Sequence, residues 1–136
     1  ILAVREGLLN SVVEKDGLGY NVISEVGYME LGSEYTVGIV MAPGEISPEI
    51  IWGGVTTAED SWMGTSWDYK ALADMTGADK VICYGLINDQ IGYILPDNDY
   101  RSMFTENEEI NAVSKISGST VAEAFAQLVG TAKRFV

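Results

Sequence analysis

The stretch YTVGIVMAPGE, residues 35–45, decides how the rest of the chain is organised. Apolar and β-branched residues follow one another through most of it, a pattern that predicts a buried strand. Pro43 has no N–H to donate to a sheet, so the strand ends before it, and Gly44 permits a backbone conformation that other residues avoid. Glu45 is therefore predicted to emerge at the exit of a strand, where α/β proteins place loops and sites.

A second apolar stretch, VICYGLINDQIGYILP at residues 81–96, repeats this arrangement. Its near-continuous apolar start, residues 81–86, predicts a strand that is buried on both faces and central in the sheet. Asn88 and Asp89 then turn the chain into a second run, residues 91–95, in which Tyr93 presents a phenol. Glu45 and Tyr93 are thus the two candidate site positions, each following a strand.

The flanking segments predict the remaining elements. Residues 21–31 and 34–41 should form an antiparallel hairpin around Gly32, and the final helix, begun at residues 118–120, should cover one face of the sheet. Three shorter helices are predicted at residues 3–14, after the Ser47 N-cap with Pro48 in the first turn, and over residues 69–75 up to Gly77. Together these elements predict an α/β fold, a mixed sheet flanked by helices, in one domain over residues 1–136.

Length, charge and composition restrict the classes of function. With 136 residues the chain can bury roughly two-thirds of its unfolded surface, and no apolar run approaches the roughly 20 residues needed to span a bilayer. Twenty acidic residues against eight basic ones give a net charge of −12, which repels phosphate backbones. Nucleic acid is therefore not an expected partner, and no transmembrane segment is expected.

Cysteine and histidine usage narrows the possible chemistry. Cys83 is the only cysteine, so an internal disulfide is excluded, and its apolar neighbours favour a small buried hydrophobe over a nucleophile. The sequence contains no histidine, which removes Ser-His and Cys-His triads and the commonest zinc ligand. Any metal site built from this chain alone would need oxygen donors.

Two polar segments allow alternative interpretations. Residues 55–68 form the least regular part of the sequence and carry Trp62 and Trp67, with Trp52 just before them. This aromatic loop either contacts a substrate or packs on its own core. Residues 97–99, Asp-Asn-Asp, predict a turn or a helix cap, because they lack the glycine and distal glutamate of a calcium-binding loop.

Several short motifs in fixed order resemble a known family. These are Val26-Gly27-Tyr28, Pro43-Gly44-Glu45, GLINDQIGYI at residues 85–94, and ISGST at residues 116–120 followed by a helix. In this order and spacing they resemble the C-terminal half of the catalytic domain of neutral (non-lysosomal) ceramidases, in particular its bacterial branch. The resemblance covers most of the chain from about residue 21 onward.

The resemblance implies an activity and a ligand set. The family hydrolyses the amide of N-acyl sphingoid lipids at a zinc ion held by histidine, glutamate and tyrosine side chains. It implies that Glu45 is a metal ligand and that Tyr93 is both a metal ligand and a catalytic residue. The histidine ligands of the family lie in its upstream half, so we expect further sequence before Ile1, and that half as a partner. The isolated chain is then expected to be inactive.

The resemblance also implies a substrate region and leaves a second function open. Trp52, Trp62 and Trp67 would line the cleft for an N-acyl, lipid-like substrate. Without the family, Glu45 is a solvated turn residue and Tyr93 a half-buried strand tyrosine. The alternative function is accordingly a non-catalytic binding or assembly domain that keeps the fold without metal. In either case an uncovered sheet edge or apolar face favours self-association.

Overall fold

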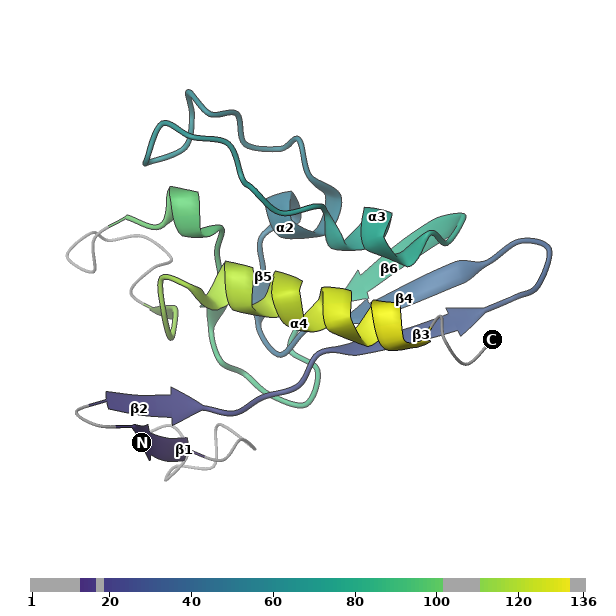
Figure 1. Ribbon diagram of the computed structural model, residues 1–136, viewed down its shortest axis with the longest axis horizontal. Helices are drawn as coiled ribbons and strands as arrows, with labels where there is room; N and C mark the ends of the chain where they lie inside the picture. The colour runs from purple at the N-terminus through teal and green to yellow at the C-terminus, as the bar shows by residue number, and fades with distance from the viewer. Residues whose placement is uncertain (1–12, 17–18, 102–110, 133–136) are drawn as a thin grey trace.

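The computed structural model describes residues 13–16, 19–101 and 111–132, and its largest sheet has three strands in the order β3-β4-β6 (Figure 1). Strand β3 (Gly27–Leu31) is antiparallel to the central strand β4 (Val37–Met41), and β4 is parallel to β6 (Lys80–Tyr84). This mixed sheet with its helices confirms the predicted α/β fold.

The predicted hairpin around Gly32 is confirmed, because Gly27 pairs with Met41 and Leu31 with Val37. Gly32 has a φ of 109°, a value that favours glycine, so the turn depends on this residue. The predicted central place of the strand at residues 81–86 is wrong. That segment forms the edge strand β6, in which Tyr84 is 52% exposed. An apolar run indicates burial but does not distinguish an edge strand from a central one.

Helices α2, α3 and α4 begin at the predicted residues or within three positions of them. Helix α2 (Pro48–Trp52) starts at Ser47, whose Oγ accepts a hydrogen bond from the Glu49 N–H at 3.3 Å. Helix α3 (Leu72–Thr76) starts three residues later than predicted and ends at Gly77, which has a φ of 70°. Helix α4 (Ser117–Ala132) takes residues 118–120 into its first turn instead of using them as the cap.

The N-terminal part of the described chain differs from its predicted structure. Strands β1 (Val13–Asp16) and β2 (Gly19–Val22) form an antiparallel pair. Most of the predicted helix at residues 3–14 lies outside the described residues, but its last two residues belong to β1. The strand predicted over residues 21–31 is divided, because residues 23–26 lie outside any strand and Ser24 Oγ donates to the Asp89 carboxylate at 2.6 Å.

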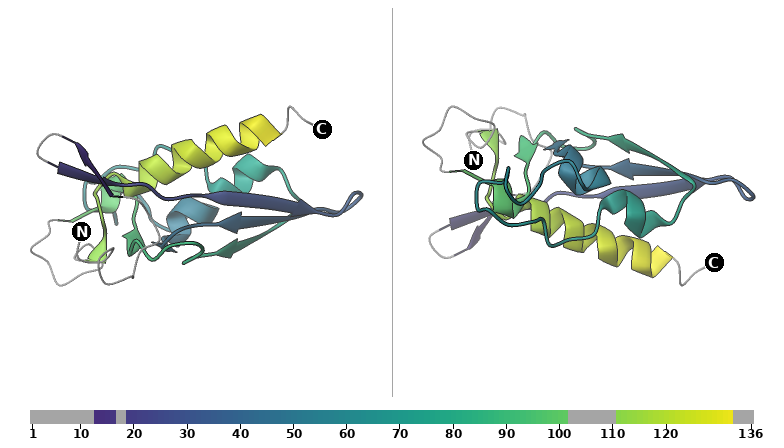
Figure 2. Two further views of the ribbon diagram at one scale, coloured as in Figure 1. Left: turned by 90° about the horizontal axis from the view of Figure 1, so that it is seen from below. Right: turned by 90° about the horizontal axis from the view of Figure 1, so that it is seen from above.

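The core lies between the sheet and the helices. Figure 2 shows α3 and α4 on the same side of the three strands, as predicted for the last helix. The Phe125 ring of α4 is fully buried and meets the Tyr28 ring of β3 edge to face, with 5.9 Å between ring centroids. The other large side chains that are fully buried are Val40, Ile50, Leu72 and Ile94.

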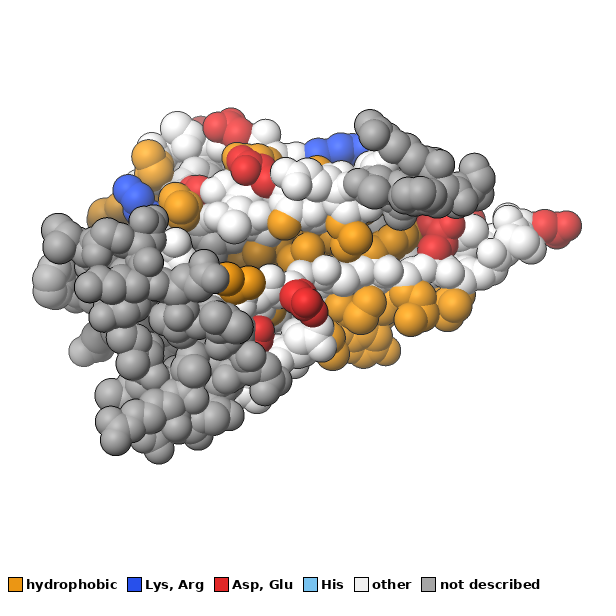
Figure 3. Space-filling model, turned by 60° about the horizontal axis from the view of Figure 1, so that its bottom comes forward, with side chains coloured by type: hydrophobic (Ala, Val, Ile, Leu, Met, Phe, Trp, Pro, Cys, Tyr) orange, Lys and Arg blue, Asp and Glu red, His pale blue; other side chains and the backbone are white. Residues whose placement is uncertain are grey.

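The opposite side of the sheet is less well covered, and we call it the open face. Alternate residues of the three strands point to it, and Met29 and Leu31 are about half exposed. Figure 3 shows hydrophobic side chains gathered on both sides of a strip of white backbone on this face of the molecule. The apolar residues of the open face are Met29, Leu31, Val37, Ile39, Met41, Ile82 and Tyr84. Within the described residues, no helix has the length and apolar character to cross a membrane.

Candidate functional site

The two candidate residues lie side by side in a short second ladder. Strand β5 (Glu45–Ile46) is parallel to β7 (Tyr93–Ile94), and Glu45 pairs with Tyr93 in the register. The Glu45 N–H donates to the Gly92 carbonyl at 2.9 Å, and the Ser47 N–H donates to the Ile94 carbonyl at the same distance. The structure therefore brings together two side chains that are 48 residues apart in sequence.

The orientation of this pair follows from strand alternation. Ile46 and Ile94, the second pair of the ladder, belong to the core, where Ile94 is fully buried and Ile46 packs against the buried cluster. Successive side chains of a strand point to opposite faces, and paired residues of parallel strands point to the same face. Glu45 and Tyr93 consequently leave the ladder together, away from the core, with Glu45 exposed and Tyr93 partly buried.

Two glycines allow close backbone approaches at this ladder, Gly44 to the partner strand and Gly92 to the segment around Asn111. A Cβ on Gly44 would lie 2.3 Å from the Gly92 carbonyl oxygen, and one on Gly92 would lie 1.7 Å from the Asn111 carbonyl oxygen. Gly92 also has a φ of 83°. Gly44 does not have a positive φ, so the prediction that it provides an unusual backbone conformation is wrong. Glycine is needed at position 44 because there is no room for a side chain there.

The turn before β7 holds two non-glycine residues in the left-handed region. Leu86 has a φ of 57° and Asn88 a φ of 69°. The turn is held against the segment before β5, because the N–H groups of Leu86 and Ile87 donate to the Gly44 and Ala42 carbonyls at 3.2 and 3.0 Å. Such conformations cost about 1–3 kcal/mol each and are common beside functional sites. Asn88 was recognisable as a turn residue, but no sequence signal marks Leu86.

Two buried carboxylates were not recognised from the sequence. Asp89 is 6% exposed and accepts the Ser24 hydroxyl, which ties the turn to the segment before β3. Glu49 is also 6% exposed and accepts the N–H groups of Val55 and Thr56 at 2.6 and 2.7 Å. Glu49 thus holds the start of the aromatic loop. Both contacts join residues that local sequence patterns do not relate.

The three tryptophans do not form one cluster. Trp52 and Trp62 are 49% and 59% exposed, and the Arg101 guanidinium lies 5.6 Å from the centroid of the Trp62 ring. Trp67 packs against the core and against Tyr69, with 5.0 Å between ring centroids. Across the described residues, no ring contact joins two tryptophans. The packing interpretation therefore suits Trp67, whereas Trp52 and Trp62 have exposed surface available for contacts.

The donor set does not by itself complete a metal centre. Among residues 13–16, 19–101 and 111–132, no group of three His, Cys, Asp or Glu side chains could hold a metal ion. A catalytic zinc needs about three protein ligands and one open position. Glu45 and Tyr93 offer two oxygen donors on one face, so they match part of such a set and leave its nitrogen donors to be supplied from elsewhere.

Burial sets the protonation of Cys83. Desolvation raises the pKa of its thiol from 9.0 to about 11, so the reactive thiolate is disfavoured at neutral pH. The side chain is partly buried and packs against the core cluster. These properties agree with the expected small hydrophobe and do not support a nucleophile.

Residues 97–99 form a short 3₁₀ helix, η1 (Asp97–Asp99), that supports two other segments. The Asp97 carboxylate accepts from the Ser119 N–H at 3.0 Å and from its hydroxyl at 2.5 Å, in the first turn of α4. The Asp99 carboxylate accepts a hydrogen bond from the backbone N–H of Trp62 at 2.9 Å, and this contact holds the aromatic loop. Residues 97–99 therefore form a turn, one of the two predicted alternatives, and Asp97 additionally hydrogen-bonds to the first turn of α4.

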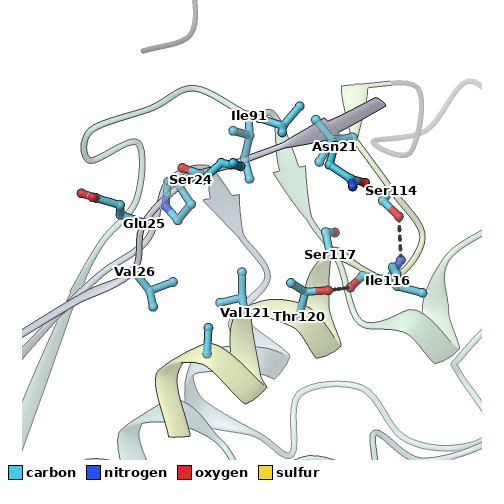
Figure 4. A pocket seen from close by; sticks show the side chains of 15 residues that line it. Asn21, Ser24, Glu25, Val26, Ile91, Ser114, Ile116, Ser117, Thr120 and Val121 are labelled. Carbon is cyan, nitrogen blue, oxygen red and sulfur yellow. Dashed lines mark hydrogen bonds between the residues drawn. The ribbon is translucent and has the colours of Figure 1, made fainter. Parts of the chain in front are cut away.

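A pocket of about 520 Å³ lies beside this ladder, between the residues before β3 and the first two turns of α4 (Figure 4). Pro43 and Ile91, which line it, precede Glu45 and Tyr93 by two residues each. The other wall comes from α4 and the segment before it, and includes Ile116, Ser117 and Val121. None of the three tryptophans lines this pocket.

Comparisons with protein-family models, curated proteins and solved structures found no match to this chain.

Proposed function

We propose that this chain is part of a zinc-dependent amide hydrolase that acts on N-acyl, ceramide-like substrates. In this proposal Glu45 is a metal ligand, and Tyr93 either binds the metal or donates a hydrogen bond to the developing oxyanion. The observation that carries the proposal is the register of β5 and β7, which pairs Glu45 with Tyr93. The resemblance of the motifs around both residues to neutral ceramidases supplies the reaction class.

The chemistry of the two side chains supports these roles. A bound zinc ion would lower the pKa of a water ligand and polarise the amide carbonyl. A carboxylate such as Glu45 adds negative charge to the ligand set, and the phenol of Tyr93 can donate a hydrogen bond to an oxyanion. The exposed Glu45 remains accessible to a substrate and to further ligands.

The remaining ligands have to come from another polypeptide segment. The 136 residues contain no histidine, and the family that the motifs resemble holds zinc with histidines from its upstream half. We therefore propose that an upstream, histidine-bearing segment of the same protein joins this chain to complete the site. The isolated chain should then neither bind stoichiometric zinc nor hydrolyse N-acyl amides.

The test compares the isolated chain with the polypeptide that contains its upstream segment. Zinc content is measured by metal analysis, and hydrolysis with N-acyl sphingosines of different acyl length. Tyr93→Phe in the longer protein should lower kcat about 100-fold, the usual loss for one oxyanion donor. Glu45→Gln should reduce zinc content, whereas Glu59→Gln, an exposed loop carboxylate, should change neither property.

Two results would contradict the proposal. One is metal-dependent hydrolysis by the 136-residue chain alone. The other is a longer protein whose zinc content and activity do not change on substitution of Glu45 and Tyr93.

A non-catalytic binding or assembly domain is the second candidate. The open face favours it, because Leu31 and Tyr84 expose apolar surface that a partner would cover. In this case the longer protein would retain no zinc, and the chain would self-associate or bind another protein through this face. Light scattering of the isolated chain, with Leu31→Glu as the comparison, separates a self-associating chain from a monomer.

A further inference from the structure

The pocket beside α4 contains a hydroxyl group that has no partner. Ser117 is 6% exposed, and its Oγ forms no hydrogen bond with any of the described residues. Figure 4 shows the Ser117 side chain rising from the first turn of α4 into the space below Asn21 and Ile91. Leaving a buried hydroxyl without a partner is unfavourable, so a ligand that bonds to Ser117 would recover free energy.

The rest of the lining is mainly aliphatic. Val22, Val26, Pro43, Ile91 and Val121 supply apolar surface around the hydroxyl. The volume of about 520 Å³ lies within the range of roughly 300–1,000 Å³ that is usual for small-molecule sites. A pocket with this lining excludes water from an alkyl chain, which is the main source of affinity for such ligands.

The charges around the pocket disfavour an anionic ligand. Neither lysine nor arginine is among the described residues that line it. The N-terminus of α4, which would otherwise attract an anion, already receives the Asp97 carboxylate through Ser119. The Glu25 carboxylate at the rim points away from the pocket in Figure 4 and adds negative charge outside it.

We propose that this pocket binds an unbranched aliphatic chain that carries one uncharged hydrogen-bonding group, a primary amide or an alcohol, placed on Ser117 Oγ. The serine hydroxyl can donate to a carbonyl oxygen or accept from an N–H or O–H, so both groups fit. Zinc plays no part in this binding, and the residues that carry the proposal all belong to the described chain.

The experiment titrates octanamide, 1-octanol and octanoate into the 136-residue chain at neutral pH by calorimetry. Octanamide and 1-octanol should bind with 1:1 stoichiometry. Octanoate should bind at least about ten-fold more weakly, because its carboxylate would lose its hydration in the pocket without forming an ion pair. Ser117→Ala should weaken octanamide binding about five-fold, which is the usual effect of one hydrogen bond.

A pair of substitutions on α4 distinguishes binding in the pocket from binding elsewhere on the helix surface. Ala124 lines the pocket and Ala126 does not, yet both side chains are exposed, so both variants should fold. Ala124→Trp should abolish octanamide binding by filling the pocket, and Ala126→Trp should retain the wild-type affinity. The proposal is overturned if wild type shows no saturable binding, if octanoate binds as tightly as octanamide, or if Ala124→Trp binds normally.

Discussion

The same two chain segments pair twice in this protein, and the two ladders differ in what they do. Strands β4 and β6 pair over five residues and form the structural sheet, whereas β5 and β7 pair over two residues and carry Glu45 and Tyr93. Met41 pairs with Tyr84, and Glu45 pairs with Tyr93. More residues separate Tyr84 from Tyr93 than Met41 from Glu45, and the excess forms the turn with Leu86 and Asn88.

This difference shows how a stable sheet can support a less stable site. The first ladder is held by side chains in the core, such as Val40, which belongs to the same buried cluster as Phe125. The second depends on backbone contacts that require glycine at positions 44 and 92, and on two left-handed residues in the turn. The free energy of unfolding should therefore fall when apolar volume is removed from the core that supports the first ladder. It should also fall when atoms are added at the glycines of the second ladder.

Removal of the Phe125 ring should have the largest effect, because it leaves a cavity in the buried cluster that also contains Val40 of the first ladder. Phe125→Ala should lower the free energy of unfolding by about 3–5 kcal/mol, the usual cost of losing a buried aromatic side chain. Urea denaturation followed by circular dichroism measures this change. Ala126→Ser on the exposed side of α4 should stay within about 0.5 kcal/mol of wild type. Similar values for the two variants would mean that α4 does not cover the sheet.

Addition of one methyl group should disrupt the second ladder. Gly92→Ala combines a left-handed φ with a contact to the Asn111 carbonyl oxygen, and we expect a loss of about 2–3 kcal/mol. Gly54→Ala is a matched control, because Gly54 has a φ of 66° but open space at its Cβ. It should cost only about 1 kcal/mol. Equal costs in urea denaturation would show that crowding at Gly92 contributes nothing.

Glu49 connects the second ladder to the aromatic loop, and its substitution should have a smaller effect. Glu49→Gln retains the shape but weakens the hydrogen bonds from the Val55 and Thr56 N–H groups, so we expect a loss of about 1–2 kcal/mol. Faster amide exchange at Val55 and Thr56 would identify the loop as the part that is released. The control Glu59→Gln should change neither stability nor exchange, because that carboxylate is exposed.

Tyr28 of β3, which pairs with Val40 of the first ladder, should make the stability of the sheet depend on pH. Burial, together with its hydrogen bond to Glu30, raises the pKa of Tyr28 from 10.0 to about 12. The folded state therefore keeps a proton that the unfolded state loses above pH 10, so stability falls as pH rises from 10 to 12. Thermal unfolding in a Cys83→Ala background measures this slope without the thiol. Tyr28→Phe should make the slope shallower, and an unchanged slope would rule out Tyr28 as its source.

Local patterns predicted those parts of the structure that depend on neighbours in sequence. The hairpin around Gly32 and the helix end at Gly77 follow from the permissive backbone of glycine, and the start of α2 follows from the hydroxyl of Ser47. The fold class followed from the order of these elements. The edge position of β6 did not follow from this order, because it depends on which segments pair with the two sides of β4.

The candidate site was predicted as two residue positions but not as a geometry. The positions of Glu45 and Tyr93 came from strand exits and motif resemblance, whereas their shared face depends on a register that the intervening turn sets. The contacts of Asp89 with Ser24 and of Asp97 with Ser119 join residues 65 and 22 positions apart. No periodicity or spacing encodes such contacts, and the same applies to the buried hydroxyl of Ser117.

The most direct test of the paired site is a disulfide between positions 45 and 93. Neighbouring parallel strands lie about 4.8 Å apart, within the Cα separations that disulfides span. In a Cys83→Ala background, Glu45→Cys/Tyr93→Cys should form an intramolecular disulfide on mild oxidation, detected by mass spectrometry. Glu45→Cys/Lys80→Cys should not, because Lys80 pairs with Val37 at the far end of the sheet. Failure of the first pair to cross-link, or equal cross-linking of both pairs, would contradict the shared position of Glu45 and Tyr93.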